Sequence, residues 1–144
     1  MEYPHGCVEQ TTSAAFPQLY LSVVKQLTDA EQARTKFNIT RAIDRLKQFV
    51  TRDGGFAYWP GNDGSDSWGS TYAGHFLIEA GQNGYYIPSD MLTRWKKYQR
   101  NKAMEWRRNE NKYHNTDLIQ AYRLYTLAAA DAAELSAMNR LREI

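Results

Sequence analysis

Residues 67–81 read SWGSTYAGHFLIEAG and residues 116–130 read TDLIQAYRLYTLAAA, and this pair of stretches decides the fold. In the first stretch, Trp68, Tyr72 and Phe76 recur at steps of four, which is the spacing of one helix face. Both stretches place a small residue, an aromatic residue and a leucine at similar offsets, and both follow a loop. Two similar helical segments, each flanked by another helix, predict stacked helical hairpins with an apolar inner surface.

Helical periodicity dominates the rest of the chain as well. It predicts helices over residues 12–27, 35–51, 67–81, 89–107, 117–130 and 132–144. The first two helices are expected to turn these residues inward: Ala15, Phe16, Leu19, Tyr20, Val23, Val24 and Leu27, then Phe37, Ala42, Ile43, Leu46, Phe49 and Val50. Thr11 or Thr12 is expected to cap the first helix, and Ser89 the fourth. Pro17 lies inside the first pattern, where it would remove a helical hydrogen bond. No strand-like alternation stands out, so the chain is predicted to be all-α.

The composition of the chain limits which classes of function are possible. The 144 residues are enough for one domain with a packed core, because 42% of them are hydrophobic. The formal net charge is +2, so no nucleic-acid partner is expected, and the basic stretch 96–108 is interpreted as a solvated helix face. No apolar run reaches the roughly 18–20 residues that span a membrane. The 3 histidines and the single cysteine lack metal-site spacing and no phosphate-binding glycine loop occurs, so no cofactor is expected.

The only cysteine lies in residues 3–12, YPHGCVEQTT. Cys7 stands at a loop-to-helix junction, where exposed amides and the positive end of the helix dipole stabilise a thiolate. Gln10 follows three residues later, and Gly6 permits the tight turn that would bring the Gln10 carbonyl carbon against the sulfur. Attack by the thiolate with loss of ammonia would leave an internal thioester, which is an acyl donor for an amine or a hydroxyl.

Such a bond survives only where water is excluded. The residues expected to provide this cover are Tyr3 and Pro4, together with the aromatic loop around Phe56, Tyr58 and Trp59. The alternative for Cys7 is an inert core residue. His5 is interpreted as a loop histidine packed on an aromatic ring, with a role as a base as the alternative. His75 is interpreted as a hydrogen-bonded core histidine and His114 as solvated.

GCVEQ resembles the Gly-Cys-x-Glu-Gln signature of the thioester domains of alpha-macroglobulins and thioester-containing complement proteins. YPHGCVEQTTSAAFPQLYL is similar to the bacterial alpha-2-macroglobulin version of this segment. DGGFAYWPG followed by SWGSTYAGHFLIEA, and AMNRLRE near the end, resemble further segments of that family. The resemblance therefore runs from residue 3 to the C-terminus. It implies an α/α toroid of the terpenoid cyclase type, of which six helices would form a partial ring.

The resemblance also implies a role. Residues 1–144 would be the N-terminal portion of a thioester domain within a much larger multidomain protein of the periplasm or cell envelope. That protein would be a single-use, covalent protease trap and not an enzyme. Its partners would be target proteases, captured through their lysine amines, and the other domains of the parent chain. Cys7 would be the thiol and Gln10 the acyl donor, while the other positions of the motif would shape the turn: Tyr3, Pro4, His5, Gly6 and Glu9.

Two other functions compete with this one. A cysteine-nucleophile acyl-transfer enzyme would need a histidine within hydrogen-bond reach of Cys7. A non-reactive helical-repeat scaffold would have an ordinary thiol and no dependence on Gln10. No histidine of the sequence can be placed as an acyl acceptor, so amines are the default target. For residues 1–144 alone we expect Cys7 to be a free thiol, because the neighbours that exclude water would be missing.

Overall fold

A computed structural model of the protein describes residues 6–108 and 116–143. Its helices are α1 (Val8–Ala15), the 3₁₀ helix η1 (Phe16–Tyr20), α2 (Leu21–Val24), α3 (Asp29–Leu46), the 3₁₀ helix η2 (Lys47–Phe49), α4 (Ser67–Gln82), α5 (Ser89–Glu105), α6 (Thr116–Ala129) and α7 (Leu135–Arg142). Within the described ranges β-type pairing is limited to one isolated bridge between Val50 and Phe56. The prediction of an all-α fold is confirmed.

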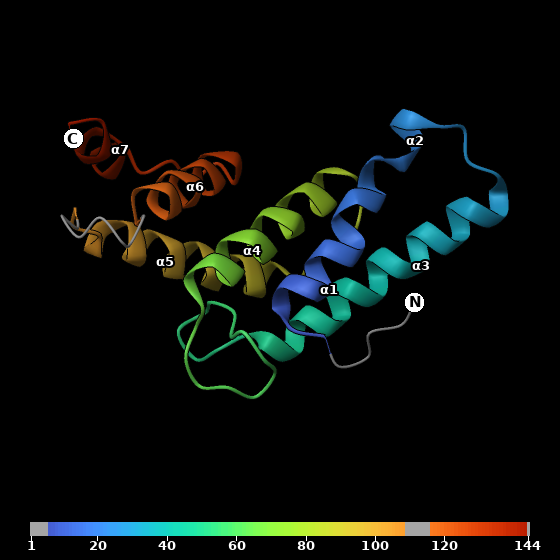
Figure 1. The fold of residues 1–144 in the computed structure, drawn as a ribbon, viewed down its shortest axis with the longest axis horizontal. Helices are drawn as coiled ribbons and strands as arrows, with labels where there is room; N and C mark the ends of the chain where they lie inside the picture. The colour runs from blue at the N-terminus through green and yellow to red at the C-terminus, as the bar shows by residue number, and fades with distance from the viewer. Residues whose placement is uncertain (1–5, 109–115, 144) are drawn as a thin grey trace.

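Helix α4 lies at the centre of the molecule (Figure 1). It contacts α1 and α3 on one side and α5 and α6 on the other, and α7 packs on α6 at the far end. The helices α1, α4 and α6 therefore lie side by side in that order. Helix α3 packs against α1, and both α5 and α7 pack against α6. This is the arrangement of stacked helical hairpins that the similar segments 67–81 and 116–130 predicted.

The main core fills the space between α1, α3, α4 and α5. Its largest members with no more than 1% exposure are Val8, Ile39, Leu46, Phe49, Phe56, Phe76, Leu77 and Trp95. Trp95 of α5 donates a hydrogen bond from Nε1 to the Ser70 carbonyl oxygen of α4, at 2.8 Å. A smaller core of Ala103, Leu124, Leu127 and Ala137 joins α5, α6 and α7. The chain thus has two apolar centres that share helix α5.

Buried polar side chains join these two centres. Gln99 of α5 is completely buried, and its Nε2 donates to the hydroxyl oxygens of Thr71 and Thr126, each at 3.2 Å. One glutamine therefore ties α4, α5 and α6 together. Gln120 of α6, also fully buried, donates to the Ala103 carbonyl oxygen at 3.1 Å. Buried amides need such partners, so these bonds fix the register of the helices.

The predicted first helix, residues 12–27, is wrong in two respects. It starts earlier, at Val8, and Cys7 rather than Thr11 or Thr12 is the N-cap residue. It is also broken, because Pro17 stands at the start of η1, where the amide hydrogen it lacks is not needed. The chain bends there, and Val23 and Val24, which were expected inside, are 78% and 77% exposed.

The predicted second helix, residues 35–51, begins too late. Helix α3 starts at Asp29 because Thr28 and Glu31 form a capping box, with Thr28 Oγ1 accepting from the Glu31 amide at 3.1 Å. Phe37 was expected inside but is 59% exposed, with the Arg41 guanidinium over its ring. Other ends shift less: Pro88 rather than Ser89 is the N-cap of α5, α5 ends at Glu105, and α7 runs only over Leu135–Arg142.

A glycine sets the distance between α4 and α5. A Cβ atom added at Gly74 would lie 2.1 Å from Cε2 of the Trp95 indole. We expect Gly74→Ala to lower the free energy of unfolding by about 2 kcal/mol or more. Overpacking of a rigid, buried ring by about 3 kcal/mol outweighs the gain of about 1 kcal/mol that alanine brings to a helix. Urea denaturation followed by circular dichroism measures the difference.

Gly81→Ala is the matched control on the same helix. A Cβ there would lie 3.6 Å from Cγ1 of Ile87, an ordinary contact, so this variant should be as stable as the original chain or slightly more stable. Equal stability of the two variants would contradict the close packing of α4 on Trp95.

Candidate functional site

Cys7 and Gln10 meet at the start of helix α1. Cys7 is the N-cap residue, with extended backbone angles φ −70° and ψ 175°. Its amide hydrogen is donated to Oε1 of Gln10, at 2.9 Å. The carboxamide of the third helical residue is thus folded back over the cap residue, as in a capping box. Cys7 is 3% exposed, so its sulfur is enclosed next to this carboxamide.

Contacts from three other elements hold this turn. Arg45 of α3 donates from Nη2 to the Gly6 carbonyl oxygen at 3.1 Å, and its guanidinium lies over the Phe49 ring. The Val8 amide donates to the Tyr58 carbonyl oxygen at 3.0 Å. Val8 also packs against Gly69 of α4, where an added Cβ would lie 2.6 Å from Val8 Cγ1. The sequence reading missed both Arg45 and Gly69, because no local pattern marks a residue that reaches the site from a distant helix.

The aromatic residues expected to cover Cys7, namely Phe56, Tyr58 and Trp59, lie in two different environments. The Tyr58 carbonyl oxygen accepts the Val8 amide, and interaction with Cys7 raises the pKa of the Tyr58 phenol. Trp59 packs edge-on against Tyr58, with ring centroids 5.7 Å apart. Phe56 is instead a core residue with no exposed surface, and its amide donates a hydrogen bond to Ser70 Oγ at 2.8 Å. Phe56 therefore anchors the loop whose next residues include Tyr58, and the Tyr58 backbone lies beside Val8.

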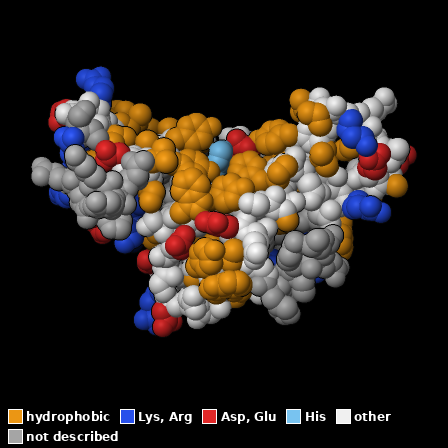
Figure 2. All heavy atoms as spheres, in the orientation of Figure 1, with side chains coloured by type: hydrophobic (Ala, Val, Ile, Leu, Met, Phe, Trp, Pro, Cys, Tyr) orange, Lys and Arg blue, Asp and Glu red, His pale blue; other side chains and the backbone are white. Residues whose placement is uncertain are grey.

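Other residues named from the sequence lie elsewhere. Tyr3, Pro4, His5 and His114 are outside the described residues. His75 lies on α4 with both ring nitrogens paired: Nδ1 is 2.8 Å from the Tyr122 hydroxyl and Nε2 is 3.2 Å from Glu79 Oε1. It is hydrogen-bonded, as expected, but it is only partly buried and packs edge-on against the rings of Phe16, Tyr122 and Tyr125. Figure 2 shows hydrophobic side chains gathered across the middle of one face of the molecule.

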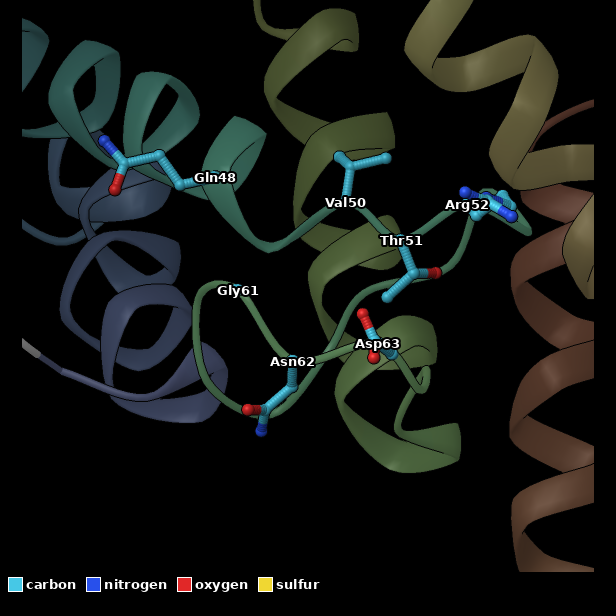
Figure 3. Close-up of a pocket in the computed structure, with 7 residues that line it drawn as sticks. All are labelled: Gln48, Val50, Thr51, Arg52, Gly61, Asn62 and Asp63. Atoms are coloured by element: carbon cyan, nitrogen blue, oxygen red, sulfur yellow. The ribbon is translucent and has the colours of Figure 1, made fainter.

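A polar cavity of about 490 Å³ lies beside the loop after α3 (Figure 3). It is lined by Gln48, Val50, Thr51, Arg52, Gly61, Asn62 and Asp63. Neither Cys7 nor Gln10 is among these residues. Among the described residues there is no group of three or more histidine, cysteine or acidic side chains able to hold a metal ion.

Comparison with known proteins identifies relatives of this chain. No family model matches the chain. The chain is 30% identical to alpha-2-macroglobulin of Escherichia coli K12 over 151 residues, which cover 98% of the chain and 9% of that protein. It is 32% identical to alpha-2-macroglobulin of Rickettsia conorii over 105 residues, 70% of the chain and 6% of that protein.

Solved structures agree. A crystal structure of Salmonella alpha-2-macroglobulin reacted with methylamine superposes with a TM-score of 0.81 at 31% identity, over 99% of the chain and 10% of that protein. The native conformation of the Escherichia coli protein gives 0.81 at 29% identity, over 98% of the chain and 9% of that protein.

The helical fold and the capped Cys-x-x-Gln turn define a class, the helical segments of large alpha-macroglobulin-type proteins. Within that class, the chain belongs to the bacterial alpha-2-macroglobulin family. It spans about a tenth of the length of the relatives it matches. In the part of the chain that the structure describes, no helix combines the length and apolar character needed to cross a membrane.

The contact between Val8 and Gly69 makes a prediction about the buried sulfur. Gly69→Ala should displace Val8 and with it the Cys7 cap, because the added methyl has no space. We expect the Cys7 thiol of methylamine-treated protein to react several-fold faster with an aromatic disulfide reagent. Gly64→Ala, whose Cβ would meet nothing within 4 Å, is the control and should leave the rate unchanged. The same rate in both variants would rule out this contact as the support of the cap.

Proposed function

We propose that this chain is part of the thioester domain of a bacterial alpha-2-macroglobulin and that Cys7 and Gln10 form the thioester that captures proteases. The observation that carries the proposal is the 2.9 Å hydrogen bond from the Cys7 amide to Gln10 Oε1, next to a sulfur that is 3% exposed. Amide and sulfur belong to one residue. The carbonyl that the amide binds is therefore held beside the residue that carries the sulfur.

The reaction starts from the thiolate of Cys7. Its sulfur attacks the side-chain carbonyl carbon of Gln10, a carbon–sulfur bond forms, and the carbon–nitrogen bond breaks. The nitrogen takes up the proton that the Cys7 thiol gave up and leaves as ammonia. The Cys7 amide hydrogen points at the carbonyl oxygen, where negative charge develops in the transition state, and so acts as an oxyanion donor. The helix start contributes further positive potential at the same place.

Capture is a second substitution at the same acyl carbon. A lysine amine of a bound protease attacks the carbonyl carbon, a carbon–nitrogen bond forms, and the carbon–sulfur bond breaks to return Cys7 as a thiol. The names of the relatives support this chemistry. The Salmonella protein was reacted with methylamine, a small amine, and the Escherichia coli protein was activated by trypsin and by porcine elastase.

The acyl group is used once, so the protein is a protease inhibitor and not an enzyme. An acyl-transfer enzyme would need a free histidine base, and the one histidine of the described residues has both ring nitrogens paired with Tyr122 and Glu79. A non-reactive scaffold would not need to bury a capping cysteine under a tyrosine. The other domains of a longer chain would present the protease, in the periplasm or cell envelope.

The decisive measurement is the intact mass of the longest chain that carries this segment, with thiol titration before and after methylamine. We expect a mass lower than the sequence by one ammonia and a thiol that appears only after methylamine. Tandem mass spectrometry of the peptide around residue 10 distinguishes methylamide from glutamine and from the glutamate that hydrolysis would leave.

Gln10→Glu is the informative variant, because glutamate retains an oxygen for the Cys7 amide but has no ammonia to release. It should keep full mass and bind no methylamine. Gln32→Ala, on the exposed side of α3, is the control and should behave like the original chain. A full-mass original chain with glutamine at position 10 and a thiol free from the start would overturn the thioester.

A further inference from the structure

The peptide group that joins Gly6 to Cys7 is held at both of its polar ends. Its carbonyl oxygen accepts a hydrogen bond from Nη2 of Arg45, on α3, at 3.1 Å. Its amide hydrogen is donated to Oε1 of Gln10, at 2.9 Å. Because a peptide group is planar, a bond that fixes the carbonyl also fixes the direction of the amide hydrogen. Arg45 therefore sets the direction in which the Cys7 amide points.

The Arg45 side chain is itself fixed. Its guanidinium lies over the ring of Phe49, 5.4 Å from the centroid, and that ring is 1% exposed. In the described part of the chain no carboxylate forms an ion pair with Arg45, whereas its neighbour Asp44 pairs with Lys47 at 2.9 Å. Arginine stays protonated in proteins. A full positive charge without an acidic partner thus lies against the Gly6 carbonyl oxygen.

A charged donor on the carbonyl side of a peptide strengthens the amide on its other side. Hydrogen bonds in a chain polarise one another, and a bond from an ionised donor is stronger than one from a neutral donor. Electron density drawn toward the Gly6 oxygen leaves the Cys7 amide hydrogen more positive. That hydrogen faces Oε1 of residue 10, on the carbon at which both proposed substitutions occur.

Resting on the proposed thioester, we propose that Arg45 orients and strengthens the Cys7 amide as an oxyanion donor and so speeds the capture of amines. The oxygen of residue 10 is still present in the thioester, because only the nitrogen leaves when that bond forms. The same amide can therefore serve formation and capture. Arg45 acts through the Gly6–Cys7 peptide, so it is a positioning residue.

The capture step balances without an added reactant. The amine nitrogen attacks the carbonyl carbon of residue 10, and the carbonyl oxygen takes up negative charge opposite the Cys7 amide hydrogen. The carbon–sulfur bond then breaks with its electron pair on the sulfur, and the carbonyl forms again as an amide. The proton that the attacking nitrogen loses ends on the Cys7 sulfur. Arg45 gives up no proton at any point.

Arg45→Met removes the charge and the donor but keeps a long side chain that can cover Phe49. The protein is the longest chain that carries this segment, the probe is methylamine, and the readout is release of the Cys7 thiol. We expect ammonia loss as in the original chain and a reaction about tenfold slower, since outright removal of an oxyanion donor costs about 100-fold to 1000-fold and here the donor is only weakened. The direction is decisive: a support that merely loosened would expose the acyl group and speed its reaction.

Arg45→Lys keeps the charge but lacks the planar fork, so it should react more slowly than the original chain and faster than the methionine variant. If Arg45→Met does not fold, the lysine variant alone carries the test against the original chain. Arg140→Met is the matched control. Arg140 of α7 also donates from Nη2 to a backbone carbonyl oxygen at 3.1 Å, that of Ala103, but α7 lies far from α1 (Figure 1). This control should react at the original rate.

A folded Arg45 variant that has lost ammonia and reacts at the original rate or faster would overturn the role of Arg45 and leave the thioester standing. Glutamate at position 10 of the untreated Arg45→Met chain would mean early hydrolysis of a loosened site and would also overturn that role. A folded variant that keeps full mass and glutamine at position 10 would extend the role to thioester formation. An original chain that never loses ammonia would overturn both proposals.

Discussion

The hydrogen bond from the Cys7 amide to the Gln10 carboxamide is the constraint on which the site depends. It begins α1 at Val8, and α1 then supplies Ala15 and Val8 to the main core. A helix start has amides without partners inside the helix, so a side chain must fold back to satisfy one of them. Here the side chain that does so is the acyl donor of the proposed reaction. The need to cap a helix and the need to align two reactants are met by one contact.

The loop between η2 and α4 places the Tyr58 backbone beside Val8, the first residue of α1. Asp53 holds the loop from inside, accepting from Ser65 Oγ at 2.6 Å and from the Gly55 amide at 3.2 Å. Gly54 has a φ of +94° and lies against the Arg94 carbonyl oxygen of α5, where a side chain would not fit. The Asp53-Gly54-Gly55 run therefore packs against α5, and Phe56 and Tyr58 follow it in the chain.

The fold was predictable wherever a local pattern decides it. Helix α4 was placed within one residue at each end, because its periodic face acts over a few residues. The sequence also marked Pro17 as a disruption of the first helix, but it did not predict the exposure of Phe37, which depends on what packs there in three dimensions. The pairing of Cys7 with Gln10 was suggested by their spacing along the chain. Arg45 and Gly69 contact Gly6 and Val8 across 39 and 61 positions of sequence, and no single-sequence pattern reports such contacts.

The exposed fraction differs among the residues around the cap. This matters because a thioester must be kept from water until a target amine arrives. Cys7 is 3% exposed, whereas Tyr58 and Trp59 of the neighbouring loop are 38% and 45% exposed. The cap is followed by the fully buried Val8, while the aromatic side chains of the loop lie at the surface. Local openings of exposed loops cost far less free energy than opening a core. We therefore expect this loop to move more readily than the helix that carries Gln10.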